Sequence, residues 1–481
     1  MSRRGKINLL IIVTISVLVL PIVKARGGSI EADILEGEFL VSFDEVDEEI
    51  IAFLEENQFK VVRRMDQINL LLVKAVGEIR AKDCAESLLS NPRARYVEPN
   101  VIVRLPTMEF IPVIGASQMM GSPQIESSTP PDDPLWASDP LTGVGQWNMR
   151  VIDADEAWRI HVGAHNTVVA ILDTGVFSEH QDLDANYEPG GYDWVNVDED
   201  PHDDHGHGSW VAGIIAAETG NGYGVAGLAQ VLIMAEKVLD ERGVGTLSDV
   251  ISGLVHSADL GVDVINMSFG TYYYSEALEE AVNYAWGKGC ILVASAGNEG
   301  TDTPQYPAAL EKVLAVASTY GEPDDVRAPG SNHGSWIAVS APGGWDENGD
   351  GSPGNGEHWI ISTYNSQDVF AVGFGTSAAA PHVSGLAALY KSLHPNASNS
   401  EVEEALFYAA DDKGAPGWDE FYGYGRINAN NALKYTEISS IGGIGEITTL
   451  EGRISTRRFN PFILLSLVLI ILLTARRLHK E

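Results

Sequence analysis

The chain of 481 residues has 31 Lys and Arg against 67 Asp and Glu, a formal net charge of −36. This charge argues against a nucleic-acid partner, because phosphates demand Lys and Arg. It suits an exported, soluble surface instead. The two cysteines, Cys84 and Cys290, are too few for a disulfide scaffold, so we expect both to be small buried apolar residues.

The first 25 residues are predicted to be a secretory signal peptide. Arg3, Arg4 and Lys6 precede an apolar run, and small residues follow near Ala25. This order of charge, apolarity and small residues is typical of export signals. An uncleaved membrane anchor is the alternative.

Residues 34–105 alternate strand and helix signals in the order βαββαβ. The pattern predicts a small α+β unit, a split-βαβ sheet with helices on one face. The expected strands are 38–43, 59–65, 68–76 and 94–105, and the expected helices are 46–58 and 81–91. Residues 106–131 contain Pro, Ser and Gly without a clear period, and are predicted to form an exposed linker.

Residues 132–435 show continuous apolar runs alternating with helical patterns. Such runs are typical of parallel strands covered on both faces. The expected strands are 167–175, 231–239, 262–270, 290–298 and 313–319, with helices at 248–261 and 275–289. The pattern predicts a doubly wound, mostly parallel α/β domain, with its chemistry at the carboxyl ends of the strands. Asp173, Ser268 and Asn298 stand at such ends.

The segment GFGTSAAAPHVSG, residues 373–385, surrounds one hydroxyl with Gly and Ala. A helix is expected from Ser377 to residue 393, with Pro381 in its first turn, where a missing N–H costs little. The hydroxyl of Ser377 would then stand at a helix N-terminus, which favours negative charge. A simple N-cap serine is the alternative.

An active serine needs a base, a carboxylate that orients the base, and donors for the oxyanion. His207 precedes a helix start rich in small residues, and His205 competes with it. Asp173 follows a buried strand and suits the carboxylate, although it could simply cap the next turn. Asn298 could present its amide beside the backbone N–H of Ser377.

Four motifs then resemble the subtilisin family of serine proteases. They are DTG at 173–175, HGHGSWVAG at 205–213, SAGN at 295–298 and GTSAAAPHVSG at 375–385. The order Asp, His, Ser is also that family's. The resemblance implies that Asp173 orients, His207 is the base, Ser377 the nucleophile and Asn298 the oxyanion donor. Ser209, Trp210 and Ala378 depart from the residues more common in the family.

The resemblance covers about residues 34–435 and implies a self-processing precursor. The first unit is similar to an inhibitory propeptide, and the linker would contain the cleavage site. Protein or peptide substrates would pair with two extended segments beside a pocket lined by small residues, which favours large apolar side chains. The residues implied to bind substrate are Gly243, Val244, Gly245, Ser268, Phe269, Gly270, Ser295, Ala296 and Gly297.

A calcium site resembles one found in several family members. Carboxylates of Asp133 and Asp182, the Asn221 amide and the carbonyls of Glu218, Tyr223 and Val225 would supply oxygen ligands. A plain turn at 218–225 is the alternative.

A second Ca²⁺ site is predicted from spacing alone, in an insertion between residues 343 and 361. Oxygen-bearing residues and a glycine follow the D-x-[DN]-x-[DN]-G-x₅-E spacing of a calcium loop. The predicted ligands are Asp346, Asn348, Asp350, Ser352 and Glu357. An acidic, Gly-rich surface loop without metal is the alternative.

The C-terminus ends in an apolar run with a basic stop. We expect a stalk at 436–459, a membrane segment at 460–475 and a basic tail at 476–481, so that the exported protein is tethered. A buried terminal helix and a sorting signal that is clipped and replaced are the alternatives.

Two other functions compete with a secreted serine endopeptidase. One is a binding or scaffold protein on an inactive protease fold, because fold alone does not prove activity. The other is an esterase that uses the same three side chains.

Overall fold

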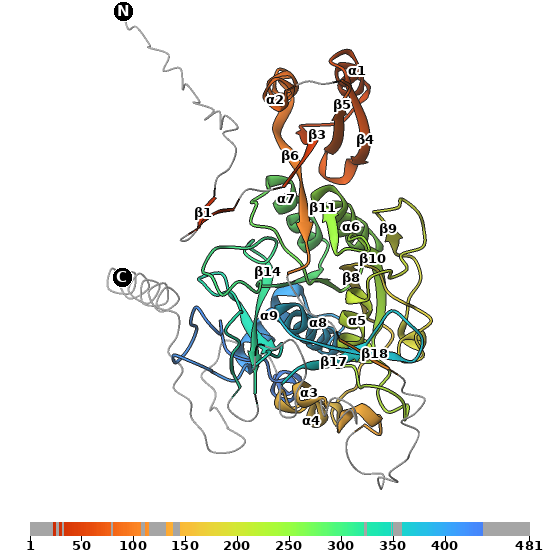
Figure 1. The fold of residues 1–481 in the computed structure, drawn as a ribbon, viewed down its shortest axis with the longest axis vertical. Helices are drawn as coiled ribbons and strands as arrows, with labels where there is room; N and C mark the ends of the chain where they lie inside the picture. Colours follow the sequence, from red (N-terminus) through yellow and green to blue (C-terminus); the bar gives the residue numbers. More distant parts are fainter. Residues whose placement is uncertain are drawn as a thin grey trace, which may run out of the picture.

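The computed structural model describes residues 23–25, 28–30, 33–77, 80–106, 111–114, 131–137, 145–321, 325–347, 349 and 358–435. The predicted stalk, membrane segment and basic tail, and residues 1–22 of the predicted signal peptide, lie outside these ranges. No helix in the described ranges combines the length and apolarity that a membrane crossing requires. Figure 1 shows a small N-terminal unit (residues 34–105, red to orange) standing on a large unit (132–435).

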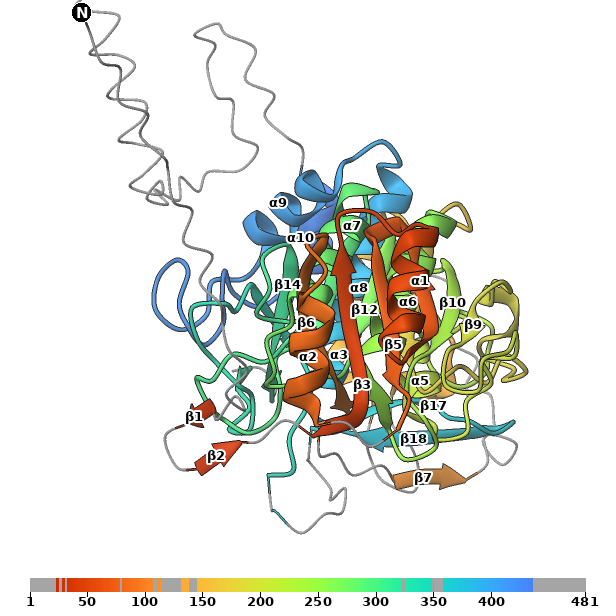
Figure 2. The ribbon, with the colours of Figure 1, turned by 90° about the horizontal axis from the view of Figure 1, so that it is seen from above.

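The N-terminal unit has the predicted βαββαβ order. Its strands and helices are β3 (Ile34–Phe43), α1 (Glu48–Glu56), β4 (Phe59–Met65), β5 (Leu70–Ala75), α2 (Ala81–Leu89) and β6 (Ala94–Arg104). The strands form an antiparallel sheet in the order β6-β3-β5-β4. Figure 2 shows α1 and α2 on the outer face of this sheet. A short antiparallel pair, β1 (Val23–Ala25) and β2 (Gly28–Ile30), precedes the unit.

The large unit is built on a mostly parallel sheet, as predicted. Its order is β15-β14-β13-β12-β8-β10-β9, with β16 also paired to β14, and only the β14–β15 pair is antiparallel. The strands are β8 (Val168–Asp173), β9 (Tyr192–Asp193), β10 (Leu232–Lys237), β12 (Val264–Met267), β13 (Ile291–Ser295), β14 (Val313–Tyr320), β15 (Val326–Arg327) and β16 (Val339–Pro342).

Helices cover both faces of this sheet. Helix α8 packs against β12, β13, β14 and β16, and also against α5, whereas α6 and α7 pack together on the opposite face. The helices are α3 (Trp147–Val151), α4 (Ala154–Trp158), α5 (His207–Ala216), α6 (Leu247–Leu260), α7 (Glu276–Gly287), α8 (Thr376–Leu393), α9 (Asn399–Ala409) and α10 (Ala429–Lys434).

Local sequence signals explain where several of these helices begin and end. Thr246 accepts a hydrogen bond from the N–H of Asp249 at the start of α6, and Gly261 ends that helix with positive φ. Ser398 and Glu401 form a capping box at the start of α9. Such caps satisfy backbone groups that a helix end leaves unpaired.

The two units share one of their hydrophobic cores. The helix-bearing face of the small sheet has its own core, which includes Phe39, Ile50 and Leu88. The opposite face, with Leu40 and Leu72, joins a core that contains α6 and α7 side chains of the large unit. Burial of this second face therefore depends on contact between the units.

The linker departs from the prediction of a structureless segment. Residues Ile111–Ile114 form strand β7, which pairs antiparallel with β18 (Val369–Gly373), and β18 pairs in turn with β17 (Ile360–Thr363). The segment Ile-Pro-Val-Ile lies in a stretch that contains Pro, Ser and Gly and has no clear period, so the sequence did not predict this strand. Pro is tolerated at a sheet edge, where its missing N–H need not bond.

Candidate active site

Asp173 and His207 form a buried pair. Asp173 ends strand β8 and His207 begins helix α5; both side chains are fully buried, and the distance from His207 Nδ1 to Asp173 Oδ1 is 2.7 Å. The N–H of Thr174 also donates to this carboxylate oxygen, at 2.8 Å. A carboxylate that holds Nδ1–H leaves Nε2 as the basic nitrogen of a neutral imidazole.

Asp203, which the sequence analysis missed, links the two segments that carry this pair. Its buried carboxylate accepts hydrogen bonds from Thr174 Oγ1 (2.8 Å), from the N–H groups of His205 (3.0 Å) and Gly206 (2.8 Å), and from the N–H and hydroxyl of Ser209. These bonds tie the end of β8 to the first turn of α5. The only sequence signal was an acidic residue four positions before His207.

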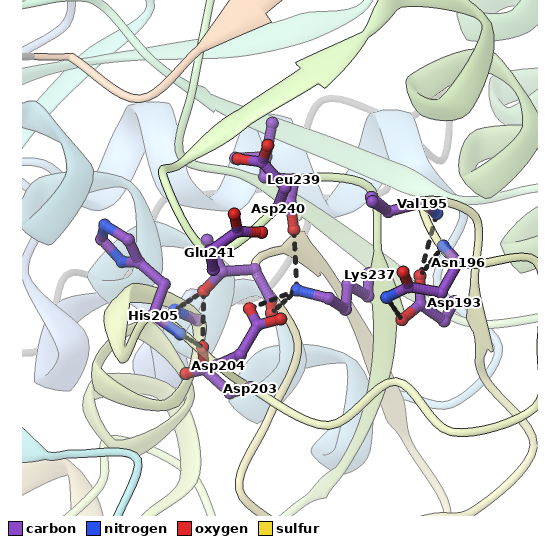
Figure 3. Close-up of polar contacts among 12 residues, drawn as sticks. Asp193, Val195, Asn196, Asp203, Asp204, His205, Lys237, Leu239, Asp240 and Glu241 are labelled. Atoms are coloured by element: carbon purple, nitrogen blue, oxygen red, sulfur yellow. Dashed lines mark hydrogen bonds and ion pairs between the residues drawn. The ribbon is translucent and has the colours of Figure 1, made fainter.

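Lys237 is a buried cation beside the same strand end. Its ammonium group donates to the carbonyls of Thr174 (2.8 Å) and Leu239 (2.9 Å) and to Asp204 Oδ1 (2.7 Å). Figure 3 shows Lys237 pointing toward Asp204 and Leu239. In the sheet, Lys237 pairs with Asp173. In the sequence, Lys237 lies within an apolar run predicted as a strand, which gives no sign of these contacts.

His205 lies at the edge of the site and does not replace His207. It is only partly buried, its ring stands 6.4 Å from that of His207, and burial lowers its pKa. Ser209 bonds Asp203, and Trp210 Nε1 donates to the carbonyl of Ala371 at 3.1 Å. Ser209 and Trp210, which depart from the family pattern, therefore fix the first turn of α5 through hydrogen bonds to Asp203 and to strand β18.

Ser377 is the second residue of α8, and its hydroxyl is fully buried. The hydroxyl donates to the Ser268 carbonyl (3.0 Å), while the Ser268 hydroxyl donates to the Ser377 carbonyl (3.1 Å). Because α8 begins at Thr376, Pro381 lies beyond the predicted first turn. A helical N–H at position 381 would bond the Ser377 carbonyl. Pro381 cannot donate this bond, and the Ser268 hydroxyl replaces it.

Asn298 follows β13 and has an oriented amide. Its Oδ1 accepts from the N–H (2.9 Å) and the hydroxyl (2.8 Å) of Thr376. No acceptor among the described residues bonds its Nδ2, so both donors of that nitrogen remain available. A Cβ at Gly375 would lie 2.7 Å from this Nδ2, so the site requires glycine there. The amide therefore lies beside the N-terminus of α8, one residue before Ser377.

The two predicted substrate segments flank a strand of the chain itself. Strand β11 (Val244–Thr246) pairs antiparallel with β6. On the same side, the N–H of Leu105 donates to the Gly243 carbonyl at 2.9 Å. On the other side of β6, Arg104 exchanges backbone hydrogen bonds with Gly270. The N-terminal unit thus inserts an extended strand between the segments expected to bind substrate.

The other predicted substrate-binding residues lie at the carboxyl ends of β12 and β13. Ser268, Phe269, Ser295, Ala296 and Gly297 are all buried. The Phe269 side chain belongs to the core shared by the two units, so only its backbone can face a substrate. Gly297 has φ +102° and donates its N–H to the Thr376 hydroxyl.

The residues of the first predicted calcium site come together. Asp133 accepts the N–H groups of Gly220 (2.8 Å) and Asn221 (3.3 Å), and Asp182 accepts from Asn221 Nδ2 (2.9 Å) and the N–H of Val225 (2.9 Å). Burial raises the pKa of Asp133 to about 6 and that of Asp182 well above its usual value. No Lys or Arg of the described chain pairs with either carboxylate.

Three backbone carbonyls of the first predicted calcium site accept no hydrogen bond from the described residues, whereas the Asn221 Oδ1 accepts the N–H of Tyr223 at 2.8 Å. In the described ranges, no hydrogen bond reaches the carbonyl oxygens of Glu218, Tyr223 and Val225, so these remain available as ligands. No group of three or more Asp, Glu, His or Cys side chains in the same ranges is arranged to hold a metal. Any calcium here therefore relies on carbonyl and amide oxygens as well as the two carboxylates.

The second predicted calcium site falls largely outside the described residues. Of its ligands, only Asp346 lies inside; its Oδ1 accepts the N–H of Gly349 at 2.8 Å. Asn348, Asp350, Ser352 and Glu357 lie outside, so this site stays a prediction.

Comparison with known proteins gives one consistent family. A model described as the subtilase family matches residues 164–425, and one described as the fervidolysin N-terminal prodomain matches residues 22–100. The chain is 36% identical over 405 residues to a thermophilic serine proteinase of Bacillus sp. (strain AK1), covering 83% of this chain and 88% of that protein. It is 40% identical over 299 residues to thermitase of Thermoactinomyces vulgaris, covering 62% of this chain and 99% of that protein.

A solved structure extends the likeness to both units. The crystal structure of fervidolysin from Fervidobacterium pennivorans, titled a keratinolytic enzyme related to subtilisin, matches with a TM-score of 0.70 and 26% identity. The match covers 86% of this chain and 62% of that one. Together with the buried site described above, these matches show that the chain belongs to the subtilase family of serine proteases and carries a fervidolysin-like prodomain.

Proposed function

We propose that this subtilase cuts peptide bonds with Ser377 as nucleophile, His207 as general base and Asp173 as the group that orients it. The observation that carries the proposal is the buried 2.7 Å contact between His207 Nδ1 and Asp173 Oδ1. It fixes the imidazole tautomer that can accept a proton at Nε2.

The reaction would run through a covalent acyl-enzyme. Ser377 Oγ attacks the substrate carbonyl carbon while its proton passes to His207 Nε2. The Asn298 amide and the N–H of Ser377 stabilise the resulting oxyanion. The intermediate collapses, His207 returns the proton to the leaving amine, and water then hydrolyses the acyl-enzyme by the same route.

The prodomain strand supports both self-inhibition and a specific first cut. Arg104 pairs with Gly270 in antiparallel register. Continued by two residues, this register sets Pro106 opposite Ser268, whose carbonyl accepts the Ser377 hydroxyl. We therefore infer that the chain first cuts its own Pro106–Thr107 bond, within the linker predicted from sequence.

The structure supports one calcium ion more strongly than two. Asp133, Asp182 and Asn221, with the carbonyls of Glu218, Tyr223 and Val225, would hold Ca²⁺ and relieve two buried carboxylates of their unpaired charge. The ion would stabilise the loop at 218–225 and take no part in peptide cleavage. The second calcium site, in the loop at 346–357, is supported only by the spacing of its residues.

We also propose that the protein acts outside the cell. Two relatives are named as extracellular: the minor extracellular protease Epr of Bacillus subtilis and the halolysin-like extracellular serine protease Nep of Natrialba magadii. The export signal predicted at 1–25 and the membrane segment predicted at 460–475 support secretion followed by tethering, with the membrane as a partner.

Hydrolysis of casein and of a simple ester by wild-type protein and Ser377→Ala tests the activity. We expect wild-type protein to cut both and the variant to cut neither. Ester cleavage without casein cleavage would favour an esterase. Inactivity of the wild type toward both substrates, after removal of the prodomain, would favour a scaffold on an inactive fold.

A further inference from the structure

Strand β18, which leads into the nucleophile, takes its outer partner from the linker. The register pairs Ile111 with Val372, Pro112 with Ala371, and Val113 with Phe370. Ile111 is half-buried and packs against a core cluster that includes Leu135, Phe370 and Val372. The contact therefore combines backbone pairing with apolar burial.

The strands β6 and β7 pair with different segments of the enzyme, β6 with β11 and Gly270, and β7 with β18. The prodomain backbone is paired up to Leu105, and pairing resumes at Ile111. On the enzyme, Ser268 stands beside the first paired segment, and β18 ends at Gly373, four residues before Ser377. With the cut at Pro106–Thr107, Ile111 to Ile114 are the fifth to eighth residues after the cut bond.

We propose that the outer edge of β18 is a binding site for substrate residues five to eight positions beyond the cut bond. After the first cut, β7 is still joined to the enzyme, so the site opens when a second cut beyond Ile114 releases β7 and leaves this edge without a partner strand. An extended stretch of a protein substrate would then add to β18 as a new strand. This inference rests on the proposed function.

The chain's own strand indicates what such a substrate looks like. An apolar side chain is favoured at the fifth residue, where Ile111 packs. The sixth residue needs no backbone N–H, because Pro112 has none. In an antiparallel pair, hydrogen-bonded positions alternate, so the N–H groups of the fifth and seventh residues are the ones that face β18. Long unfolded or extended proteins meet these requirements better than short peptides.

The test uses enzyme with a protease site inserted at 115–130, from which the piece between Thr107 and that site, β7 included, has been removed. Three peptides share the same residues from four before to four after the cut bond. One ends there, one continues as Ile-Ala-Val-Ile, and one carries that extension with N-methyl groups on its fifth and seventh residues. A fourth, N-methylated on the sixth residue only, is the matched control.

We expect the plain extension and the sixth-residue control to raise kcat/KM roughly tenfold over the short peptide, mainly through KM. The doubly methylated extension should lose this gain. Enzyme that retains residues 107–131 after the first cut should show no gain, because β7 still covers the edge.

Equal kcat/KM for all four peptides would overturn the proposal, and so would a gain that double N-methylation leaves intact. Cleavage of the short peptide distinguishes failure of the proposed peptidase activity from failure of the proposed β18 site. If that peptide is not cut at all, the proposed peptidase activity fails, whereas cutting it without any gain from the extension removes only the β18 site.

Discussion

The catalytic unit and the prodomain bury their sheets in different ways. The catalytic sheet is covered on both faces by helices of its own unit. The prodomain covers one face of its sheet with α1 and α2, and the other face shares a core with the enzyme's α6 and α7. The active site should therefore depend on contacts within one unit, whereas the fold and the inhibitory action of the prodomain should depend on contacts between units.

After loss of the nucleophile itself in Ser377→Ala, the largest effect expected inside the catalytic unit is that of Asn298→Ala. Loss of the amide donor should lower kcat by a factor on the order of 10²–10³ and change KM little, a magnitude taken from the equivalent donor of subtilisin. Steady-state kinetics on a peptide substrate measure it. The control is the midpoint of thermal unfolding, which should be the same in the variant and the wild type. Partial unfolding of the variant would also lower kcat, but it would lower this midpoint as well.

Across the interface, the largest expected effect is that of Arg63→Ala. Arg63 donates to Asp249, to the carbonyls of Ser248 and Trp194 and to the Ser252 hydroxyl. Loss of such a largely buried ion pair costs about 2–5 kcal/mol, so the inhibition constant of the added prodomain should rise at least thirtyfold.

Arg64→Ala is the matched control for Arg63→Ala. The neighbouring side chain is exposed and bonds only Asp66, within the prodomain itself. The inhibition constant of the Arg64→Ala prodomain should differ from that of the wild-type prodomain by less than twofold. Similar losses for the two variants would mean that the prodomain is weakened as a fold and not at its contact with the enzyme.

Calcium removal should lower the thermal stability of the catalytic unit and leave its contact with the prodomain unchanged. At a hundredfold excess over its dissociation constant, a bound ion stabilises by about 2.7 kcal/mol. Removal by EDTA should therefore lower the midpoint of thermal inactivation by roughly 5–10 °C for a unit of this size. In the Asp182→Asn variant this sensitivity should shrink; equal sensitivity in wild type and variant would place the ion elsewhere.

The smallest expected effect is that of replacing Glu98, a prodomain residue whose carboxylate caps the N-terminus of α7. Its carboxylate accepts from the Ser275 hydroxyl and from the N–H groups of Glu276 and Ala277. Glu98→Ala removes a helix cap worth about 1 kcal/mol, so the inhibition constant should rise about fivefold.

The same residue predicts how inhibition changes with pH. Burial raises the pKa of Glu98 to about 7 in the complex, whereas a glutamate exposed in the free prodomain keeps its ordinary lower value. A pKa raised on binding means that binding takes up a proton. Inhibition should therefore be strongest at acid pH and weaken as the pH rises through 7. Glu98→Gln should flatten this profile; an identical profile in the variant would exclude Glu98 as its source.

The sequence predicted well those parts whose signals are local. Strand β4 has the predicted bounds, 59–65, and the helix expected at 377–393 begins one residue earlier. Strand β7 and the roles of Asp203 and Lys237 were not predicted. Each depends on partners brought by the fold: β7 on β18, more than 250 residues away, and the two charges on the backbone around Thr174. The hydrophobic periodicity of a short segment cannot predict contacts with residues so far away in the sequence.

The central claim is that the chain cuts its own Pro106–Thr107 bond with Ser377. Mass spectrometry of freshly refolded protein, with N-terminal sequencing of the larger fragment, tests it most directly. We predict a prodomain fragment that ends at Pro106, an enzyme fragment that begins at Thr107, and an uncut Ser377→Ala chain. A first cut at any other bond, or normal cutting of Ser377→Ala in a protease-free preparation, would contradict the account.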